Sequence, residues 1–233
     1  MLSENILNFN QNLSLPDDEL PGNFGFMNPF QDDPHGQINR ITETFYRKYY
    51  NDNQPRKILL GINPGRHGAG VTGIPFTDTE RLENVCGIDP GGFSTYEPSS
   101  VFVYAVIDAF GGPETFYSSF YVNSLSPLGY TTVNKKGNTV NANYYDDKQL
   151  QEAVEPFMIA KLQEQISWGL DTDVCYCLGK GKHFAYFNKL NKKHRFFDKV
   201  VPLEHPRYVV QYKWKKRDEY ILKYLKLLKG EGI

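Results

Sequence analysis

The sequence has few of the features that mark secreted, membrane or metal-cluster proteins. It contains only three cysteines, Cys86, Cys175 and Cys177, which are too few for a disulfide framework or a four-cysteine iron–sulfur cluster. No run of about 18 apolar residues predicts a membrane span, and no basic segment followed by an apolar one predicts a signal peptide. The histidines show no metal-ligand spacing with cysteine. We therefore expect a cytoplasmic protein without a metal or other cofactor.

A net charge of only −1 hides an uneven distribution of charge. Residues 1–179 carry 11 Lys and Arg against 22 Asp and Glu, whereas residues 180–233 carry 15 against 5. Phosphate binding needs a local basic surface and not a basic protein. The C-terminal part therefore makes nucleic acid a candidate partner, and a solvated basic helix is the alternative explanation.

Segments typical of strands and of helices alternate along the chain. Apolar and β-branched segments predict strands near 57–62, 120–128, 174–179 and 200–204. Helical spacing and capping residues predict helices over 38–50, 101–110, 147–168, 182–191 and 213–229. This alternation favours a three-layer α/β/α fold with a central, mostly parallel, four-stranded sheet.

The remaining segments define the expected domain boundaries. Residues 1–35 are rich in Asn, Asp, Pro and Gly and predict an N-terminal arm, so residues 36–233 form a single domain, expected to be a monomer. Many Gly, Thr and Pro residues over 68–98 predict a long functional loop. The sequence around Lys135-Lys136-Gly137 predicts a surface hairpin over 130–140.

Polar residues stand beside Pro or Gly, or in a polar turn, at the expected ends of three strands, namely Asn63, Asn123 and His205. The carboxyl ends of parallel strands meet at one edge of a sheet, where ligands bind. An amide can hold a water or pair with a base edge, and a histidine can donate to a developing anion. Phe76 adds an aromatic plane, so this set can hold and cleave a planar heterocycle. Turn closure for the two Asn, core packing for Phe76 and a structural role for His205 are the alternatives.

Three motifs contain these residues. They are Gly61-Ile62-Asn63-Pro64-Gly65 followed by Thr72-Gly73-Ile74-Pro75-Phe76, then Val122-Asn123-Ser124-Leu125-Ser126-Pro127-Leu128, and finally His205-Pro206-Arg207. In this order they resemble the first motif, the pyrimidine-reading segment and the final motif of the single-strand-selective monofunctional uracil-DNA glycosylases. The chain lacks the Ser-Pro that this family usually inserts before the Arg of its final motif. Arg66 and His67 stand where vertebrate members have Pro and an aromatic residue, so the chain more closely resembles a divergent bacterial branch of this family.

The resemblance implies a uracil-DNA glycosylase-like fold and a bacterial, monofunctional DNA glycosylase of base excision repair. Such an enzyme flips out and hydrolytically releases uracil or a related deaminated or oxidised base. It implies that Asn63 holds the attacking water and that His205 stabilises the departing base. The implied base-binding residues are Ile62, Gly65, His67, Phe76 and Asn123, and the implied DNA-binding residues are Arg66, Arg207, Tyr208, Lys213, Lys215 and Lys216. No nucleophilic lysine is implied, so we expect base release without strand cleavage.

Two other functions stay open at this point. Asn123 can pair with lactam edges in general, so a sister glycosylase for xanthine or hypoxanthine is one alternative. The other is a non-catalytic nucleic-acid or nucleotide-binding module with the same pocket. Loss of base release with retained DNA binding in Asn63→Ala would favour an enzyme over the module.

Overall fold

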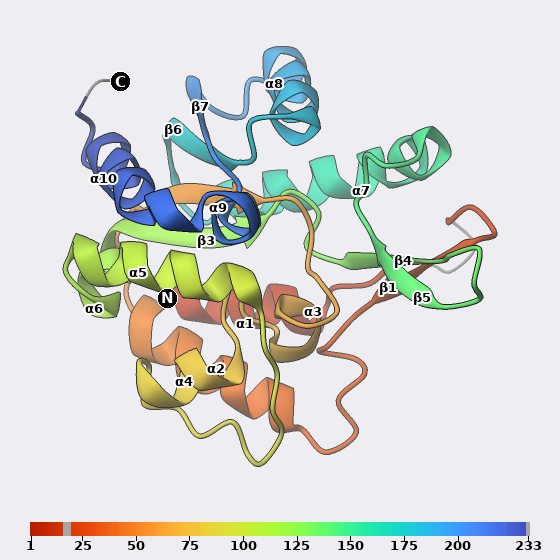
Figure 1. The fold of residues 1–233 in the computed structure, drawn as a ribbon, viewed down its shortest axis with the longest axis horizontal. Coiled ribbons are helices and arrows are strands. Elements are labelled where there is room, and N and C mark those ends of the chain that lie inside the picture. Colours follow the sequence, from red (N-terminus) through yellow and green to blue (C-terminus); the bar gives the residue numbers. More distant parts are fainter. Residues whose placement is uncertain (16–19, 232–233) are drawn as a thin grey trace.

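A parallel sheet of four strands forms the centre of the molecule, in the order β3-β2-β6-β7. The computed structural model describes residues 1–15 and 20–231. The strands are β2 (Lys57–Gly61), β3 (Phe120–Ser124), β6 (Asp171–Leu178) and β7 (Lys199–Leu203). In Figure 1, α7 (Lys148–Ile166) and α8 (Lys182–His194) lie above the sheet, and α2 (Gln37–Tyr50), α5 (Pro98–Phe110) and α6 (Pro113–Ser119) lie below it. This arrangement confirms the expected three-layer α/β/α fold.

A small antiparallel sheet stands beside the central one, on the right of Figure 1. Its strands are β1 (Phe24–Met27), β4 (Gly129–Val133) and β5 (Thr139–Ala142), in the order β1-β4-β5. Strands β4 and β5 form the hairpin expected over 130–140. The hairpin returns the chain at Ala142 to the end of β2, so it also forms part of the site described below.

The expected N-terminal arm is packed against the domain wherever it is described. Helix α1 (Leu2–Gln11) buries Leu2, Ile6 and Phe9 in the common core, and β1 pairs with β4. Residues 16–19 of the expected arm and residues 232–233 of the expected domain lie outside the described part of the chain. The division at residue 35 therefore separates segments that share one core.

Several short helices differ from the sequence-based expectation. The expected loop over 68–98 contains α3 (Ala69–Thr72) and α4 (Thr79–Asn84). The expected helix over 213–229 consists of a 3₁₀ turn (Trp214–Lys216) and α10 (Arg217–Leu228), and an unpredicted helix, α9 (Pro206–Tyr212), comes before them. Helices of four to seven residues contain too few apolar positions to produce a periodic pattern.

Local residue chemistry explains where the longer helices begin and end. The Asp147 carboxylate caps α7 by accepting from the backbone N–H groups of its first turn. Pro98 occupies the first turn of α5, where its missing N–H is not needed, so this helix begins before the expected residue 101. Gly111, with φ of +123°, ends it. Cys175 and Cys177 are fully buried in β6, as expected of packing residues.

The strand register brings four carboxyl ends to one edge of the central sheet. Gly61 at the end of β2 is paired with Ser124 of β3, and Leu178 of β6 is paired with Leu203 of β7. The residues that follow these positions therefore surround one region. None of the helices within residues 1–15 and 20–231 combines the length and the apolar character needed to span a bilayer.

Candidate active site

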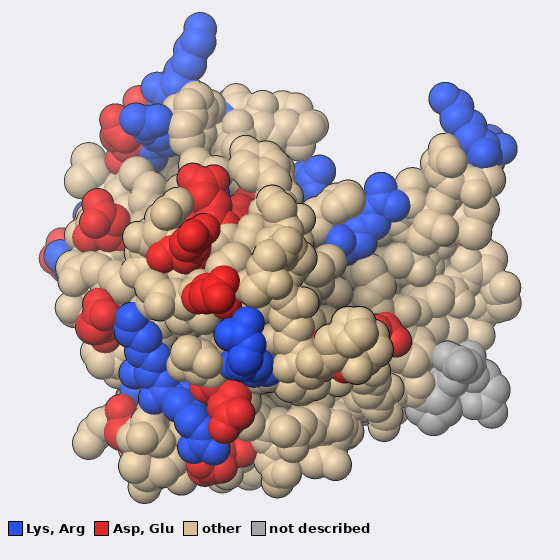
Figure 2. Space-filling model, turned by 90° about the horizontal axis from the view of Figure 1, so that it is seen from below, with Lys and Arg blue, Asp and Glu red and all other residues tan. Residues whose placement is uncertain are grey.

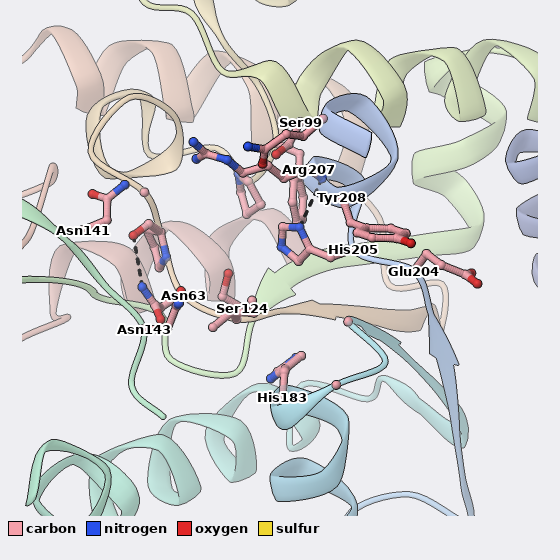
Figure 3. A pocket seen from close by; sticks show the side chains of 18 of the residues that line it. Asn63, Ser99, Ser124, Asn141, Asn143, His183, Glu204, His205, Arg207 and Tyr208 are labelled. Atoms are coloured by element: carbon pink, nitrogen blue, oxygen red, sulfur yellow. Dashed lines mark hydrogen bonds between the residues drawn. The ribbon is translucent and has the colours of Figure 1, made fainter. Parts of the chain in front are cut away.

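A cavity of about 760 Å³ opens at the carboxyl edge of the central sheet. The residues lining this cavity include seven that the sequence analysis had named, which are Ile62, Asn63, Gly65, Phe76, His205, Arg207 and Tyr208. In the view of Figure 3, Asn63 and His205 stand on opposite sides of the cavity, with Ser124 between them. The structure thus brings together an amide, an imidazole and an aromatic ring from three distant segments.

The amide of Asn63 is held in one orientation by the backbone at the end of β5 and just after it. Its Nδ2 donates to the carbonyl of Ala142 at 3.1 Å, and its Oδ1 accepts from the N–H of Tyr144 at 3.2 Å. Exchanging the two ends would place donor against donor and acceptor against acceptor, so these partners determine the orientation. A carbonyl oxygen has two lone pairs, and Oδ1 therefore retains one acceptor position for a water.

Phe76 adopts a strained backbone conformation at the wall of the cavity. It is buried and has a φ of +54°, in the left-handed region; such conformations cost about 1–3 kcal/mol and are concentrated at functional sites. Its ring lies against the end of β2, where a Cβ on Gly61 would stand 3.1 Å from Phe76 Cζ. The ring centroid lies 6.1 Å from that of His205. Glycine at position 61 therefore allows the ring to approach the strand.

His205 caps α9 and is held as a neutral donor. The N–H of Arg207 donates to its Nδ1 at 3.2 Å, as the dashed line in Figure 3 marks. An accepting nitrogen carries no proton, so the proton of the neutral ring is on Nε2. Desolvation, with a smaller contribution from the Arg207 charge, lowers the pKa of His205 to about 4. The ring can therefore donate through Nε2 at neutral pH.

The expectation that Asn123 lines the base pocket is not met by the geometry. Its Nδ2 donates to the Tyr121 hydroxyl at 2.8 Å and to Gln165 Oε1 at 2.7 Å. Successive side chains of a strand point to opposite faces, so the next residue, Ser124, faces the cavity instead. All five residues of β3 are buried, and the sequence therefore offered no polar alternation from which to choose between them.

His67 and Arg66 also lie elsewhere than expected. Both are exposed and neither lines the cavity. The Arg66 guanidinium donates to His67 Nε2 at 3.1 Å and to the carbonyl of Thr139 in the hairpin. These contacts fasten the loop after Asn63 to the hairpin and direct His67 away from a base in the cavity.

The three expected DNA-binding lysines, Lys213, Lys215 and Lys216, lie outside the cavity, at and after the end of α9. Lys213 Nζ stands 5.8 Å from the ring centroid of Tyr208, whose ring does line the cavity. Lys213 is thus placed beside the wall of the site, and none of the three lysines lies within it.

Several lining residues were not anticipated from the sequence. They include Glu97, Ser99, Ser124, Asn141, Asn143, Lys180, Lys182 and His183. One signal was present: Gly179-Lys180-Gly181-Lys182 joins the end of β6 to the start of α8. A glycine-rich turn between a strand and a helix N-terminus is a common anion-binding arrangement. The others lie in segments without a pattern that distinguishes cavity from surface.

A buried pair connects α8 to the catalytic candidate Asn63. The Tyr144 hydroxyl and His183 Nδ1 are 2.7 Å apart, and His183 Nε2 lies 3.4 Å from the carbonyl of Leu60. Desolvation lowers the pKa of His183 to about 3, so the ring is neutral. Because the N–H of the same Tyr144 binds Asn63 Oδ1, the pair supports the segment that orients this amide.

The arrangement suits the cleavage of a bond to a planar, neutral ring. Phe76 can stack on such a ring, His205 can donate to an oxygen that becomes negative, and Asn63 can hold a water. Across the described residues, no cluster of three or more His, Cys, Asp or Glu side chains is arranged to hold a metal ion.

Comparisons with known proteins agree with this geometry. A model of the uracil DNA glycosylase superfamily matches residues 47–229. The crystal structure of wild-type SMUG2 from Pedobacter heparinus is similar to this chain, with 46% sequence identity and a TM-score of 0.94 over 98% of this chain and 97% of that one. A search of curated proteins finds no match.

Proposed function

Because the chain belongs to the uracil-DNA glycosylase superfamily and is a DNA glycosylase, a hydrolase of N-glycosyl bonds, we propose that it flips out and releases uracil or a related deaminated or oxidised base. The observation that best supports this proposal is the placement of Asn63, Phe76 and His205 around one cavity at the sheet edge. The product would be an abasic site, the entry point of base excision repair.

The first step is extrusion of the damaged nucleotide. Unstacking costs a few kcal/mol and is easiest in single strands and mispairs. Phe76 would offset this cost by stacking on the extruded base, since base–aromatic stacking is worth about 1–3 kcal/mol. The packing that maintains the positive φ of Phe76 also keeps its ring beside Gly61 before the base arrives.

The second step is departure of the base as an anion. As the glycosidic bond lengthens, charge develops on the base, and O2 of a pyrimidine receives part of it. The Nε2–H of neutral His205 would donate to that oxygen; one preorganised donor of this kind contributes about 10²–10³-fold in rate. A neutral His205 ring suits this role because its Nε2–H can stabilise the departing base through a hydrogen bond, without transfer of the proton to the base.

The third step is attack of water on the electron-poor sugar carbon. Asn63 Oδ1, with one lone pair engaged by Tyr144, would hold and orient the water with the other. An amide is too weak a base to deprotonate water in advance, so catalysis relies on stabilisation of the leaving group. The family resemblance implies no nucleophilic lysine, and Lys180 Nζ, in the cavity wall, is paired with Glu204 Oε1 at 2.9 Å. We therefore expect a monofunctional enzyme.

Ser124 would contact the base edge that the sequence had assigned to Asn123. A hydroxyl rotates to donate or to accept, whereas an amide presents a donor and an acceptor in fixed places. This difference favours a broad set of lactam-containing bases, including xanthine and hypoxanthine alongside uracil.

The surface supports DNA as the partner. Figure 2 shows a hollow between two projecting parts of the molecule, with Lys and Arg side chains on both projections and within the hollow. Positive charge near such a hollow attracts the phosphate backbone without regard to sequence. Arg207 and Tyr208, at the start of α9, would contact the strand beside the extruded nucleotide.

Base release from single- and double-stranded oligonucleotides tests the substrate class. The oligonucleotides carry uracil, hydroxymethyluracil, xanthine or hypoxanthine, and alkali afterwards reveals abasic sites. We expect release of more than one base by the parent protein, and a range narrowed towards uracil in Ser124→Asn. An unchanged ranking in Ser124→Asn would contradict the role of Ser124, and no release of any base would contradict the proposed function.

A further inference from the structure

Glu97 places a carboxyl group in the wall of the cavity, and the three proposed steps of base release do not use it. It stands immediately before α5, and its Oε2 is buried without a hydrogen-bond partner among the described residues. The carboxyl group lies against the loop that follows Asn63, where a Cβ on Gly68 would overlap Oε2. Glycine at position 68 thus makes room for this side chain.

The charged groups that act on Glu97 are Asp78 and Arg207, from two other segments of the chain. Asp78, before α4, accepts from the Glu97 N–H at 3.1 Å and from the Ser100 hydroxyl at 2.8 Å, and it is paired with Arg81 at 3.3 Å. Arg207, at the start of α9, is the nearby positive charge, whereas Arg66, in the loop before Gly68, is bound to the hairpin. The carboxyl group of Glu97 is therefore close to another carboxylate and is without a direct partner for its Oε2.

A carboxylate in this position favours its protonated form. Burial first, and then the nearby Asp78 charge, raise the pKa of Glu97 to about 7, against the opposing effect of Arg207. An unpartnered buried charge is unfavourable, and neutralisation removes the penalty. A neutral carboxylic acid, unlike a carboxylate, is a hydrogen-bond donor.

The surroundings of Glu97 are those of an anion site. The 13-residue helix α5 begins at Pro98, so its positive end faces the cavity. Ser99, in its first turn, lines the cavity close to Arg207 in the view of Figure 3. An ionised Glu97 would repel an anion there, whereas a neutral Glu97 would add a donor.

We propose that Glu97 contacts DNA as a neutral acid, donating a hydrogen bond to a backbone phosphate beside the extruded nucleotide, together with Ser99 and Arg207. This inference rests on the proposed function, since it requires DNA to cross the mouth of this cavity. A bound phosphate favours the protonated carboxyl group, so DNA binding takes up a proton. Binding therefore weakens as the pH rises through and above neutrality.

Fluorescence anisotropy between pH 6 and pH 9 tests this linkage. The probe is a single-stranded oligonucleotide with a tetrahydrofuran abasic analogue, which contains no base to release and so is independent of base preference. In the parent protein we expect Kd to rise by up to about tenfold per pH unit above pH 7.5, the limit for one linked proton. Glu97→Gln should remove this rise, because its amide donates at every pH. The exposed Glu83→Gln, with the same loss of charge on α4, should retain it.

A pH-independent Kd in the parent, or an unchanged rise in Glu97→Gln, would overturn the proposal. If Glu97→Gln does not fold, calorimetry of the parent in two buffers of different ionisation enthalpy counts the protons directly; uptake near pH 7.5 supports the proposal and no uptake overturns it. Base release at pH 6.5 is measured in parallel. Release without proton linkage contradicts only the role of Glu97, whereas linkage without release contradicts the proposed function.

Discussion

Replacement of His205 separates its role in chemistry from its role in the fold. The side chain caps α9 through Nδ1 and presents its proton on Nε2. His205→Ala removes both, whereas His205→Asn retains a good capping residue but is too short to place a donor where Nε2 stands. The two variants should therefore differ in stability, by about 1 kcal/mol for the lost cap, and agree in catalytic defect.

The expected catalytic defect follows from the loss of one preorganised donor. Such a loss reduces kcat by about 10²–10³-fold, or roughly 3–4 kcal/mol in the barrier. The pH profile gives a second signature. With the folded pKa at about 4, His205 stays neutral and active down to about pH 5, so its protonation should not reduce the rate near pH 6.5, as it would for an ordinary histidine.

Single-turnover base release at saturating protein, from pH 5 to pH 8, measures both effects. Circular dichroism melting of the same samples measures the cap. A rate within about threefold of the parent in a folded His205→Asn would refute the assignment of His205 as the donor, given the size expected for such a donor. A parent rate that falls with a midpoint near pH 6.5, absent from His205→Asn, would refute the neutral ring.

Three further predictions follow from neighbouring contacts. Gly61→Ala places a Cβ 3.1 Å from Phe76 Cζ and 3.2 Å from Ser124 Oγ. Overpacking of this kind costs about 1–3 kcal/mol, so we expect a lower Tm and, because the Phe76 ring is displaced, a higher KM. An unchanged KM would show that the position of the Phe76 ring does not matter for substrate binding. Tyr144→Phe leaves the buried His183 Nδ1 without its hydrogen-bond partner. Urea unfolding should show a destabilisation of about 1–3 kcal/mol. A stability equal to that of the parent would contradict the hydrogen bond between Tyr144 and His183. His183 and His205, with pKa values lowered to about 3 and about 4, bind fewer protons folded than unfolded between about pH 6.5 and pH 4, which lowers stability as the pH falls through this window. Glu97, with its pKa raised to about 7, has the opposite effect, so the measurement uses Glu97→Gln; equal urea midpoints of this variant at pH 7 and pH 4.5 would contradict both histidine shifts.

The ends of the central strands were predictable because their sequence signals are strong. Strand β2 contains the apolar run Ile58–Leu60 and is followed by the turn Asn63-Pro64-Gly65, and both the strand and the turn are where the sequence indicated. The rule that parallel strands end at one edge then correctly placed Asn63 and His205 at the same cavity.

Side-chain direction was not predictable in the same way. In β3 every residue is buried, so Asn123 and Ser124 could not be told apart by alternation, and the more polar residue was preferred incorrectly for the cavity. His67 was expected in the cavity, but Arg66 binds the distant hairpin and carries the loop outwards. Such contacts between residues far apart in the chain cannot be predicted from the local sequence.

The central claim is that the site around Asn63 hydrolyses an N-glycosyl bond in DNA, and one gel assay tests it most directly. The parent protein and Asn63→Ala are incubated with a uracil-containing single strand and analysed with and without alkali, while anisotropy measures their DNA binding. We predict strand breaks by the parent only after alkali, and in Asn63→Ala equal binding with base release reduced by about 10²-fold or more, the size expected for loss of an oriented catalytic group. Full release by Asn63→Ala, or strand breaks by the parent without alkali, would contradict the account.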